Sequence, residues 1–178
     1  MNKKKERKVM HEFTGKWITD SEFFELEPRN VFHTQLNPID LPCNEHRNRH
    51  ILFRKKFSIE KFEDAKIYIS ADDYYKLYIN GQFVGQGPAP SYHFRYNYNV
   101  IDVSSFLVEG ENTIAVHTLY QGLINRVWQS GDNRHGLILD LIIDKSKICQ
   151  LTIYIFFSRL QYSLRFSNLL LQLIALRF

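Results

Sequence analysis

The sequence predicts an all-β protein, folded as an antiparallel β-sandwich and followed by an atypical apolar tail at the C-terminal end. Three observations support this fold class. Short segments alternate between apolar and polar residues, clusters of turn-forming residues separate them, and no helical periodicity extends beyond roughly ten residues. Many short strands with frequent turns are typical of two packed antiparallel sheets, and they disfavour a doubly wound α/β fold.

The N-terminal residues precede this strand pattern. Residues 1–12 are rich in lysine and arginine and are expected to form a solvated basic arm. The sandwich domain is expected to span residues 13–147. It begins with a short apolar segment at residues 15–18, which a core can anchor, and continues through residues 27–48, where three prolines predict an irregular connection.

The strands are predicted from apolar residues at every second position. The clearest case is residues 65–71, where alanine and isoleucine alternate with lysine, tyrosine and serine. This spacing places one face of the strand in a core and the other nearer to solvent. Seven segments are predicted as strands on this basis: residues 51–58, 65–71, 74–80, 82–85, 94–102, 112–120 and 136–144.

The turns between these strands have recognisable sequences. Asn80-Gly81 is the strongest signal, because a two-residue hairpin turn needs positive φ at both residues and this pair adopts it readily. It predicts a tight hairpin over residues 74–86. Residues 87–90, GPAP, predict a rigid loop that ends the ladder, and residues 109–111, EGE, predict a second turn.

The C-terminal tail, residues 148–178, differs from the rest of the chain. It is apolar, with three arginines and no acidic residue. Arg159 and Arg165 interrupt the apolar stretch, so no membrane span is predicted. An amphipathic helix that binds a membrane surface or a partner is one interpretation. We favour another, in which a frameshifted or prematurely ended reading frame produced a tail with no selected role in the fold.

The distribution of charge bears on partners and compartment. The formal net charge of +4 comes from the basic arm and the tail, so the domain between them is net negative. We therefore expect no nucleic-acid partner. The first residues contain a charged region without an apolar stretch behind it, so no secretory signal is predicted and a cytoplasmic location is expected.

Several motifs carry a resemblance to a known family. They are FRKKF at 53–57, AKIYISA at 65–71, YKLYINGQFVG at 75–85, DVSSFL at 102–107 and GEN at 110–112. Together, over residues 52–141, they resemble the N-terminal β-sandwich of bacterial α-L-rhamnosidases, a galactose-binding-like jelly roll that precedes a helical catalytic barrel. The sandwich of β-galactosidase-like hydrolases shares much of the pattern and is the alternative. The FRKKF strand and the tyrosines before Asn80 favour the rhamnosidases.

The resemblance implies a non-catalytic accessory module that is truncated before the catalytic domain. The catalytic carboxylates of the resembled family lie in the helical barrel, so we expect no catalytic residue here and no enzymatic activity from the chain alone. The expected partners are the missing catalytic domain and a rhamnose-containing glycan. The alternatives are an independent carbohydrate-binding protein and a structural sandwich whose tail recruits a partner.

The acidic residues of the sandwich do not suggest catalysis. Glycoside hydrolysis needs two carboxyl groups that face each other across the bond, roughly 5 to 9.5 Å apart. The candidates in this chain are Asp72, Asp73, Asp132 and Asp140. Adjacent residues of a regular strand point to opposite faces, so Asp72 and Asp73 are not expected to flank one bond. A role at a hairpin end or in a loop is expected for them.

Ligand binding is predicted for the loop between residues 120 and 135. Sugar rings stack on aromatic side chains, while their hydroxyl groups need fixed polar partners. The residues predicted to bind a ligand are Tyr120, Asn125, Arg126, Trp128, Asp132 and Asn133. For Trp128, packing against the missing catalytic domain is an equally weighted alternative.

Calcium is the one metal that the resemblance suggests, because some relatives of this sandwich bind rhamnose through calcium. Asp132 and Asn133 offer hard oxygen ligands of the kind that this ion prefers. Two such residues are too few for an ion that takes roughly six to eight oxygen ligands. We therefore predict no metal and no cofactor.

Overall fold

The computed structural model describes residues 10–29, 46–122, 130–148 and 154–156. Its strands are β1 (Arg49–Ile59), β2 (Ala65–Asp72), β3 (Tyr74–Ile79), β4 (Gln82–Gly87), β5 (Asn99–Asp102), β6 (Gly110–Tyr120), β7 (Gly136–Ile143), β8 (Ser146–Ile148) and β9 (Tyr154–Phe156). The helices are α1 (Ser21–Phe24) and a 3-10 helix at Ser104–Phe106. The fold class is therefore all-β, as predicted.

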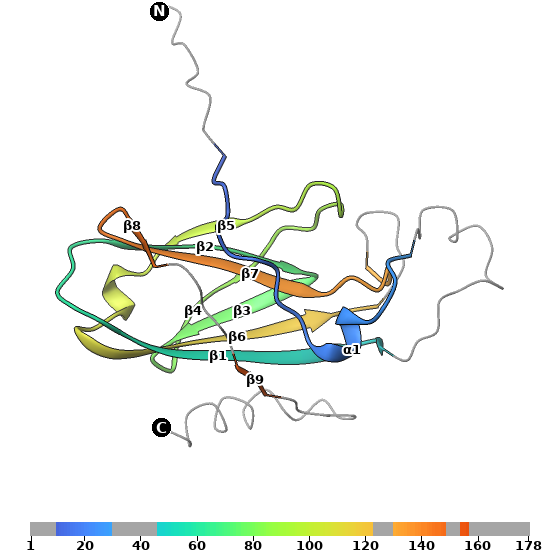
Figure 1. The fold of residues 1–178 in the computed structure, drawn as a ribbon, viewed down its shortest axis with the longest axis horizontal. Helices are drawn as coiled ribbons and strands as arrows, with labels where there is room; N and C mark the ends of the chain where they lie inside the picture. Colours follow the sequence, from blue (N-terminus) through green and yellow to red (C-terminus); the bar gives the residue numbers. More distant parts are fainter. Residues whose placement is uncertain (1–9, 30–45, 123–129, 149–153, 157–178) are drawn as a thin grey trace, which may run out of the picture.

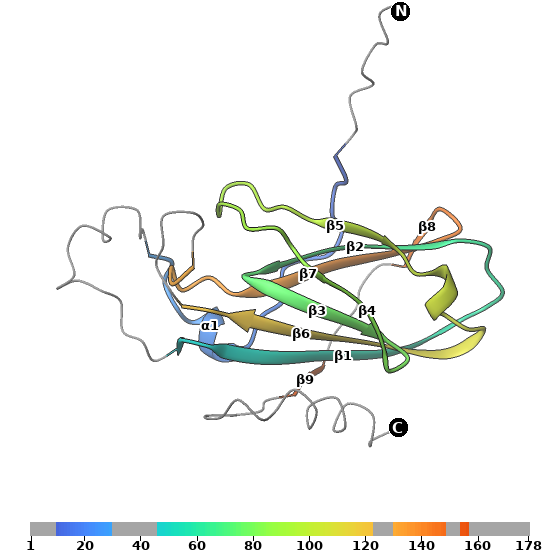
Figure 2. The same ribbon diagram turned by 180° about the vertical axis from the view of Figure 1, so that it is seen from behind.

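The strands form two antiparallel sheets that lie in two layers (Figure 1). One sheet has the order β4-β3-β6-β1-β9 and the other the order β5-β2-β7-β8. The view from behind shows the same two layers, with α1 at one end of the sandwich (Figure 2). The predicted antiparallel β-sandwich is confirmed.

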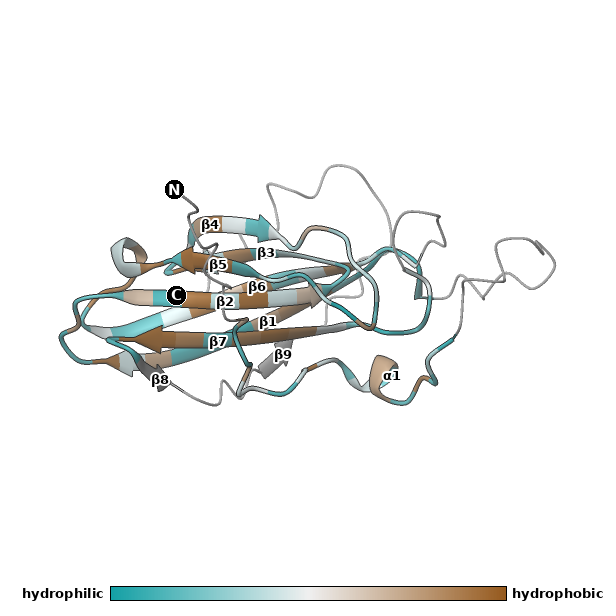
Figure 3. Ribbon diagram, turned by 90° about the horizontal axis from the view of Figure 1, so that it is seen from above, coloured by the Kyte–Doolittle hydropathy of each residue, from teal (hydrophilic) through white to brown (hydrophobic). Residues whose placement is uncertain are grey.

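The core lies between the two sheets and takes alternate residues from each strand. In β2 the side chains of Ala65, Ile67, Ile69 and Ala71 are at most 2% exposed, which confirms the predicted alternation. The facing sheet contributes these buried side chains: Phe53, Tyr75, Leu77, Ile114 and Val116. Figure 3 shows the apolar residues concentrated on the strands of both layers. Removal of this apolar surface from water is the main stabilising term for such a fold.

The predicted hairpin is formed by β3 and β4. Ile79 pairs with Gln82 across the turn. The two turn residues, Asn80 and Gly81, have φ angles of 49° and 79°. Both angles lie in the left-handed region that asparagine and glycine adopt most readily, so the turn signal in the sequence is confirmed.

Asn112, the last residue of the GEN motif, fixes the approach to β6. Its buried side-chain amide donates to the carbonyl groups of Val108, at 2.6 Å, and Gly110, at 3.0 Å. Its Oδ1 accepts from the Val108 N–H and from the side-chain amide of Asn80. The two asparagines therefore connect the hairpin to the neighbouring strand, which is a physical reason for this spacing of motifs.

The N-terminal segment, residues 10–18, crosses the outer face of the four-stranded sheet and covers β7. The strand β7 is consequently buried along both faces, with all but one of its residues buried. Ile18 and Leu137 exchange two backbone hydrogen bonds of 2.9 Å, and Ile18 packs against the core. The expectation that an apolar segment at residues 15–18 is anchored by the core agrees with this contact.

Asp140 of β7 holds the N-terminal segment in place. Its carboxylate accepts hydrogen bonds from the backbone N–H groups of Thr14, at 3.0 Å, and Gly15, at 3.1 Å, and lies 2.8 Å from Nε2 of His11. Burial alone would raise the pKa of Asp140, but the hydrogen bonds from Thr14, His11 and Gly15 lower it. His11 thus makes a tertiary contact although it falls within the predicted basic arm.

The strand predicted at residues 94–102 is wrong over its first half, because only Asn99–Asp102 form β5. Hydrogen bonds of Asn97 account for the difference. Its side chain donates to the carbonyl of Pro90, at 3.0 Å, and its own carbonyl accepts from the Ser70 hydroxyl, at 2.7 Å. These hydrogen bonds pair polar groups of Asn97 outside a strand ladder, so residues 94–98 form a loop instead of the first half of a strand.

Two of the aromatic residues of this loop contact the N-terminal segment. Tyr96 lies against Trp17, with ring centroids 4.8 Å apart, and Tyr98 contacts Phe13 edge-on at 5.6 Å. Both partners belong to the N-terminal segment. The aromatic series therefore attaches that segment to the sheet, and its spacing of two imitates a strand.

Two short strands were not predicted. β8 continues the four-stranded sheet next to β7, and β9 pairs with β1 so that Ile155 lies opposite Phe53. β9 falls within the predicted tail, of which the structure describes only residues 148 and 154–156. The division of the chain at residues 12 and 147 stays a prediction. In the described residues, no helix has the length and apolar character that crossing a membrane requires.

Candidate functional site

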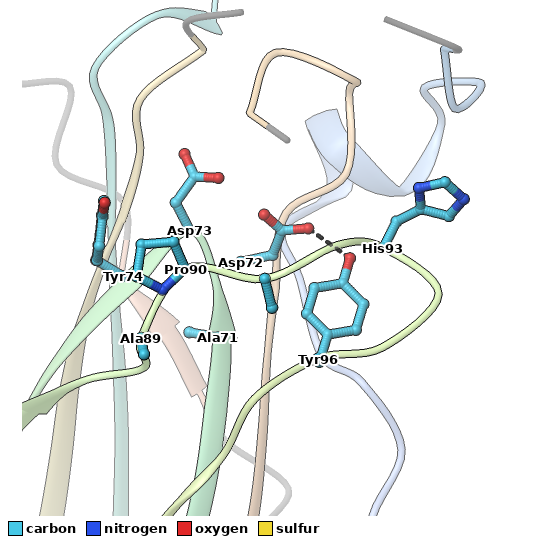
Figure 4. A pocket seen from close by; sticks show the side chains of 9 residues that line it. Ala71, Asp72, Asp73, Tyr74, Ala89, Pro90, His93 and Tyr96 are labelled. Atoms are coloured by element: carbon cyan, nitrogen blue, oxygen red, sulfur yellow. Dashed lines mark hydrogen bonds between the residues drawn. The ribbon is translucent and has the colours of Figure 1, made fainter. Parts of the chain in front are cut away.

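A small hollow lies where the chain passes from β2 to β3. Its walls come from residues 71–74 and from the loop that follows β4 (Figure 4). The residues that line it are Ala71, Asp72, Asp73, Tyr74, Ala89, Pro90, Ser91, His93 and Tyr96. Its volume of about 20 Å³ suits a single water-sized group, and a larger ligand would contact its mouth.

Asp72 and Asp73 both line this hollow, so the expectation that they point to opposite faces is wrong. The expectation assumed a regular strand, and β2 ends at Asp72. The peptide bond between the two residues is cis. Both side chains are largely buried, with 7% and 9% of their surfaces exposed. The end of the strand therefore gathers two carboxyl groups at one place.

Asp73 has one engaged oxygen and one open oxygen. Its Oδ2 accepts hydrogen bonds from the Gln121 N–H, at 2.7 Å, and from the Ser130 hydroxyl, at 2.5 Å. These bonds attach the described ends of the loop between β6 and β7 to the end of β2. Its Oδ1 is buried and has no hydrogen-bond partner among the described residues. A buried acceptor without a partner is unfavourable, so this atom is suited to receive a donor from a ligand.

Asp72 is poised to remain protonated. Burial, and then the neighbouring Asp73 carboxyl, raise its pKa well above the usual range. The Tyr96 hydroxyl donates a hydrogen bond of 2.6 Å to its Oδ2, as Figure 4 shows, and opposes this rise. Burial also raises the pKa of Tyr96, with the Asp72 charge as the next cause. Asp72 and Tyr96 therefore form a neutral hydrogen-bonded pair on one side of the hollow.

Asp132 lies near the same end of the sandwich and is 1% exposed. Its Oδ2 accepts from the Arg134 guanidinium at 2.7 Å, and its Oδ1 accepts from the Arg134 N–H at 3.0 Å. Burial raises the pKa of Asp132, while its contacts with Arg134 lower it in part. Both oxygens of the Asp132 carboxylate are therefore engaged by Arg134, and these bonds hold the loop before β7 in its conformation.

The structure describes three of the six residues predicted to bind a ligand. Tyr120 is 2% exposed, packs edge-on against Phe23, and its hydroxyl accepts from the Asn133 N–H at 3.0 Å. The Asn133 side chain donates to the carbonyl of Glu27. Together with Asp132, these residues attach the loop to the core. The other three, Asn125, Arg126 and Trp128, lie outside the described residues, and the ligand-binding role of the set stays a prediction.

The hollow also includes residues that the sequence analysis did not select for binding. Tyr74, His93 and Tyr96 stand around the two carboxyl groups (Figure 4). One signal for the position was present in the sequence, namely two adjacent acidic residues directly after an apolar strand. Such residues at the end of a strand lie at the edge of a sheet, where loops gather and ligands bind.

The hollow has room for a single hydroxyl group. A hollow of about 20 Å³ leaves no room for a sugar ring between Asp72 and Asp73. Asp132 is held by Arg134, and Asp140 is held by the N-terminal segment on another face.

No metal is assigned to the site. In residues 10–29, 46–122, 130–148 and 154–156, no three histidine, cysteine or acidic side chains come together to hold an ion. The carboxylate of Asp132, which the calcium hypothesis needs, is engaged by Arg134.

Comparison with known proteins gives one family and several related structures. Residues 60–153, more than half of the chain, match the family described as "Alpha-L-rhamnosidase N-terminal domain". A GH78 family rhamnosidase of Bacillus sp. GL1 is 32% identical over 62% of this chain, with a TM-score of 0.57. An α-L-rhamnosidase of Aspergillus terreus is 29% identical over 66% of this chain, with a TM-score of 0.50.

The matched regions are small parts of those two enzymes. They cover 12% of the Bacillus chain and 14% of the Aspergillus chain. A comparison with curated proteins gave no match. The likeness therefore concerns one domain and does not extend over the length of the related hydrolases.

Proposed function

Because the chain belongs to the α-L-rhamnosidase N-terminal domain family, we propose that it is a non-catalytic, carbohydrate-associated module of a rhamnosidase-like glycoside hydrolase. Its role in this proposal is to help the hydrolase fold and to position a glycan next to the catalytic domain. The module contacts an α-L-rhamnoside weakly through the hollow at the end of β2.

The observation that carries the proposed contact is the open Oδ1 of Asp73. This oxygen is buried, lacks a partner among the described residues, and belongs to a residue that lines the hollow. A sugar hydroxyl is a donor of suitable size for a hollow of about 20 Å³. One hydroxyl inserted beside Asp73 would remove the cost of the unsatisfied acceptor.

Aromatic and polar groups at the mouth of the hollow suit the rest of a sugar. Tyr74 and His93 lie at its rim, and Tyr96 stands on the side of Asp72. Sugars present C–H faces that pack on aromatic rings and hydroxyl groups that need fixed partners. With only one hydroxyl buried, the affinity of the isolated chain is expected to be low, in the millimolar range.

The proposed lack of catalysis rests on the carboxyl groups. Asp132, the third acidic side chain at this end of the sandwich, is engaged by the Arg134 guanidinium. Asp72, the acidic neighbour of Asp73, has a raised pKa and is hydrogen-bonded to Tyr96. Asp72 and Asp73 serve in binding and in holding the loops.

Replacing Asp73 by asparagine tests the site. The amide oxygen of Asp73→Asn can still accept from Gln121 and Ser130, while the amide nitrogen replaces the open Oδ1 with a donor. We expect this change to weaken the binding of methyl α-L-rhamnoside at least roughly tenfold, since a hydrogen bond to a charged group is lost. Isothermal titration calorimetry measures the change, in buffers with calcium and with EDTA.

The matched control is Asp64→Asn, which makes the same change of charge just before the opposite end of β2. The side chain of Asp64 is about half exposed and pairs with Lys66 at 3.6 Å. This variant should bind the rhamnoside as the unmodified chain does. Equal affinity of Asp73→Asn and the unmodified chain would place the sugar elsewhere. Absence of heat in both buffers would remove the sugar contact and leave a structural accessory role.

A further inference from the structure

A second, larger hollow opens on the outer face of the five-stranded sheet, and we name it the basic groove. It has a volume of about 470 Å³, and strands β1, β3, β4 and β6 contribute to it. The side chains that matter for its chemistry are His50, Tyr74, Tyr75, Lys76, Asn99 and His117. Lys76 lies opposite His117 in the register of β3 and β6, which places these two side chains on the same face.

The charged and titratable side chains of the basic groove are cationic or able to become so. His50 from β1, Lys76 from β3 and His117 from β6 line it, and no aspartate or glutamate is among the described residues that do. Lys76 is exposed and forms no ion pair with another described residue. Near neutral pH the positive charge of the groove comes from Lys76, because the pKa of His117 is about 4 and that of His50 is lowered, and this charge attracts an anion.

The two histidines of the basic groove lie close together. Nδ1 of His50 lies 2.8 Å from Nε2 of His117. Burial lowers the pKa of both rings, and Lys76 lowers them further; for His117, whose pKa falls to about 4, the His50 ring also contributes. A negative charge bound here would offset the repulsion that disfavours protonation of the pair.

Two residues of the groove lining, Tyr75 and Asn99, carry polar atoms without partners at the edge between the two sheets. The Tyr75 hydroxyl and the Asn99 Oδ1 are buried and have no hydrogen-bond partner among the described residues. Gly87 lies directly beside them, since a Cβ at this position would come 3.2 Å from the Tyr75 hydroxyl and 2.5 Å from the Asn99 oxygen. Tyr75 and Lys76 are neighbours in β3 and point to opposite faces, so this hydroxyl lies on the core side of the strand, where only glycine fits beside Asn99.

The basic groove lies next to the hollow at Asp73, because Tyr74 and Ala89 line both. A glycan with one sugar at Asp73 would reach the groove by passing over Tyr74. We infer that the basic groove binds the carboxylate of a uronic-acid residue, one sugar further along the glycan whose neutral sugar contacts Asp73. This inference rests on the proposed function and narrows its ligand to acidic oligosaccharides.

The test compares two disaccharides with the full chain by isothermal titration calorimetry. One contains rhamnose linked to galacturonate, and the other contains rhamnose linked to galactose, which lacks the carboxylate. We expect the acidic disaccharide to bind roughly tenfold more tightly at low ionic strength, because a charge-assisted contact is added. The difference should shrink as salt is added and grow as the pH falls below neutrality.

Two lysine variants locate the effect. Lys76→Met should reduce the ratio of the two affinities to near one without changing the affinity for the neutral disaccharide. Lys66→Met, the control, removes an exposed lysine from the opposite sheet and should change neither affinity. An unchanged ratio in Lys76→Met would overturn the inference.

The remaining outcomes separate this inference from the proposed function. Equal affinity for both disaccharides would overturn the uronate site and leave the proposed function intact. Binding of galacturonate alone, dependent on Lys76, together with no binding of the neutral disaccharide, would support the site and overturn the contact at Asp73. No binding of any saccharide would overturn both the uronate site and the contact at Asp73, and would leave only a structural accessory role. A tri-glutamate peptide that binds more tightly than galacturonate would assign the groove to a protein partner and overturn the inference.

Discussion

Replacing Phe53 by alanine is expected to lower the free energy of unfolding by about 3 to 5 kcal/mol. Phe53 is 1% exposed and belongs to the core cluster formed by both sheets. Its ring stacks toward His135, just before β7 of the other sheet, with 6.5 Å between ring centroids. Truncation removes apolar contacts on both sides of the interface and leaves a cavity that the sheets cannot fill without moving.

Chemical denaturation followed by circular dichroism measures this loss. The matched control is Phe94→Ala, at a residue that is 70% exposed in the loop before β5. It should change the free energy of unfolding by no more than about 0.5 kcal/mol. A loss below about 1 kcal/mol for Phe53→Ala would contradict the assignment of this residue to a packed core between two sheets.

Acidification is expected to destabilise the chain, with His135 as a large contributor. Its ring is 7% exposed and is hydrogen-bonded to the hydroxyl groups of Thr118, at 2.9 Å, and Thr19, at 3.3 Å. Burial, with a smaller effect of the Arg49 charge, lowers its pKa from 6.5 to about 3. The unfolded chain therefore takes up a proton at a higher pH than the folded chain does.

The direction of the effect follows from this difference. A histidine with a lowered folded pKa contributes stability above pH 6.5 that is lost as the pH falls toward 3. Between pH 7 and about pH 4.5, His135 alone should account for a loss of roughly 2 to 3 kcal/mol. His117 acts in the same direction. Asp72, Asp73 and Asp132 have raised pKa values and act in the opposite direction, because the stability they contribute is lost as the pH rises.

His135→Gln separates this contribution from the others. Glutamine keeps a hydrogen bond to a threonine but takes up no proton, so the variant should lose less stability on acidification than the unmodified chain does. Urea denaturation at several pH values between 7 and about 4.5 measures the two slopes. His93→Gln, at an exposed histidine, should retain the original slope. Equal slopes for His135→Gln and the unmodified chain would mean that His135 is accessible to protons in the folded state.

The parts of the fold that the sequence predicted well are those set by local chemistry. The alternation in residues 65–71 predicted the buried face of β2 correctly, because every second residue of a strand lies on the same face and only one of the two sets is apolar. The Asn80-Gly81 pair gave the hairpin, because few other residues adopt its backbone angles. Both signals involve neighbours along the chain.

The parts that the sequence did not predict depend on distant contacts. The aromatic residues at positions 96 and 98 have strand spacing, yet their partners are Trp17 and Phe13 in the N-terminal segment. Nothing in the loop itself indicates these partners. Likewise, β9 contains few residues and acquires its place only by pairing with β1. Tertiary packing overrides local pattern in such segments.

The candidate site shows the same limit. The sequence shows two adjacent aspartates after an apolar strand. The expectation that they point to opposite faces assumed that the strand continues through both residues, but β2 ends at Asp72. The Asp73–Ser130 hydrogen bond joins residues that are 57 positions apart, and Asp73 Oδ1 becomes an open acceptor only in that setting. The basic groove likewise requires the register of β1, β3 and β6, which brings His50, Lys76 and His117 together.

The most direct test of the account is a two-dimensional NMR titration of the isotope-labelled chain with methyl α-L-rhamnoside. The account predicts that amide signals shift at the hollow, at Asp73 and Tyr74 and in the loop that contains His93 and Tyr96, while the signals of the sugar show an intact glycosidic bond over days. Shifts confined to other parts of the sandwich would contradict the proposed site. Release of free rhamnose by the pure chain would contradict the central claim that this module binds a glycan without cleaving it.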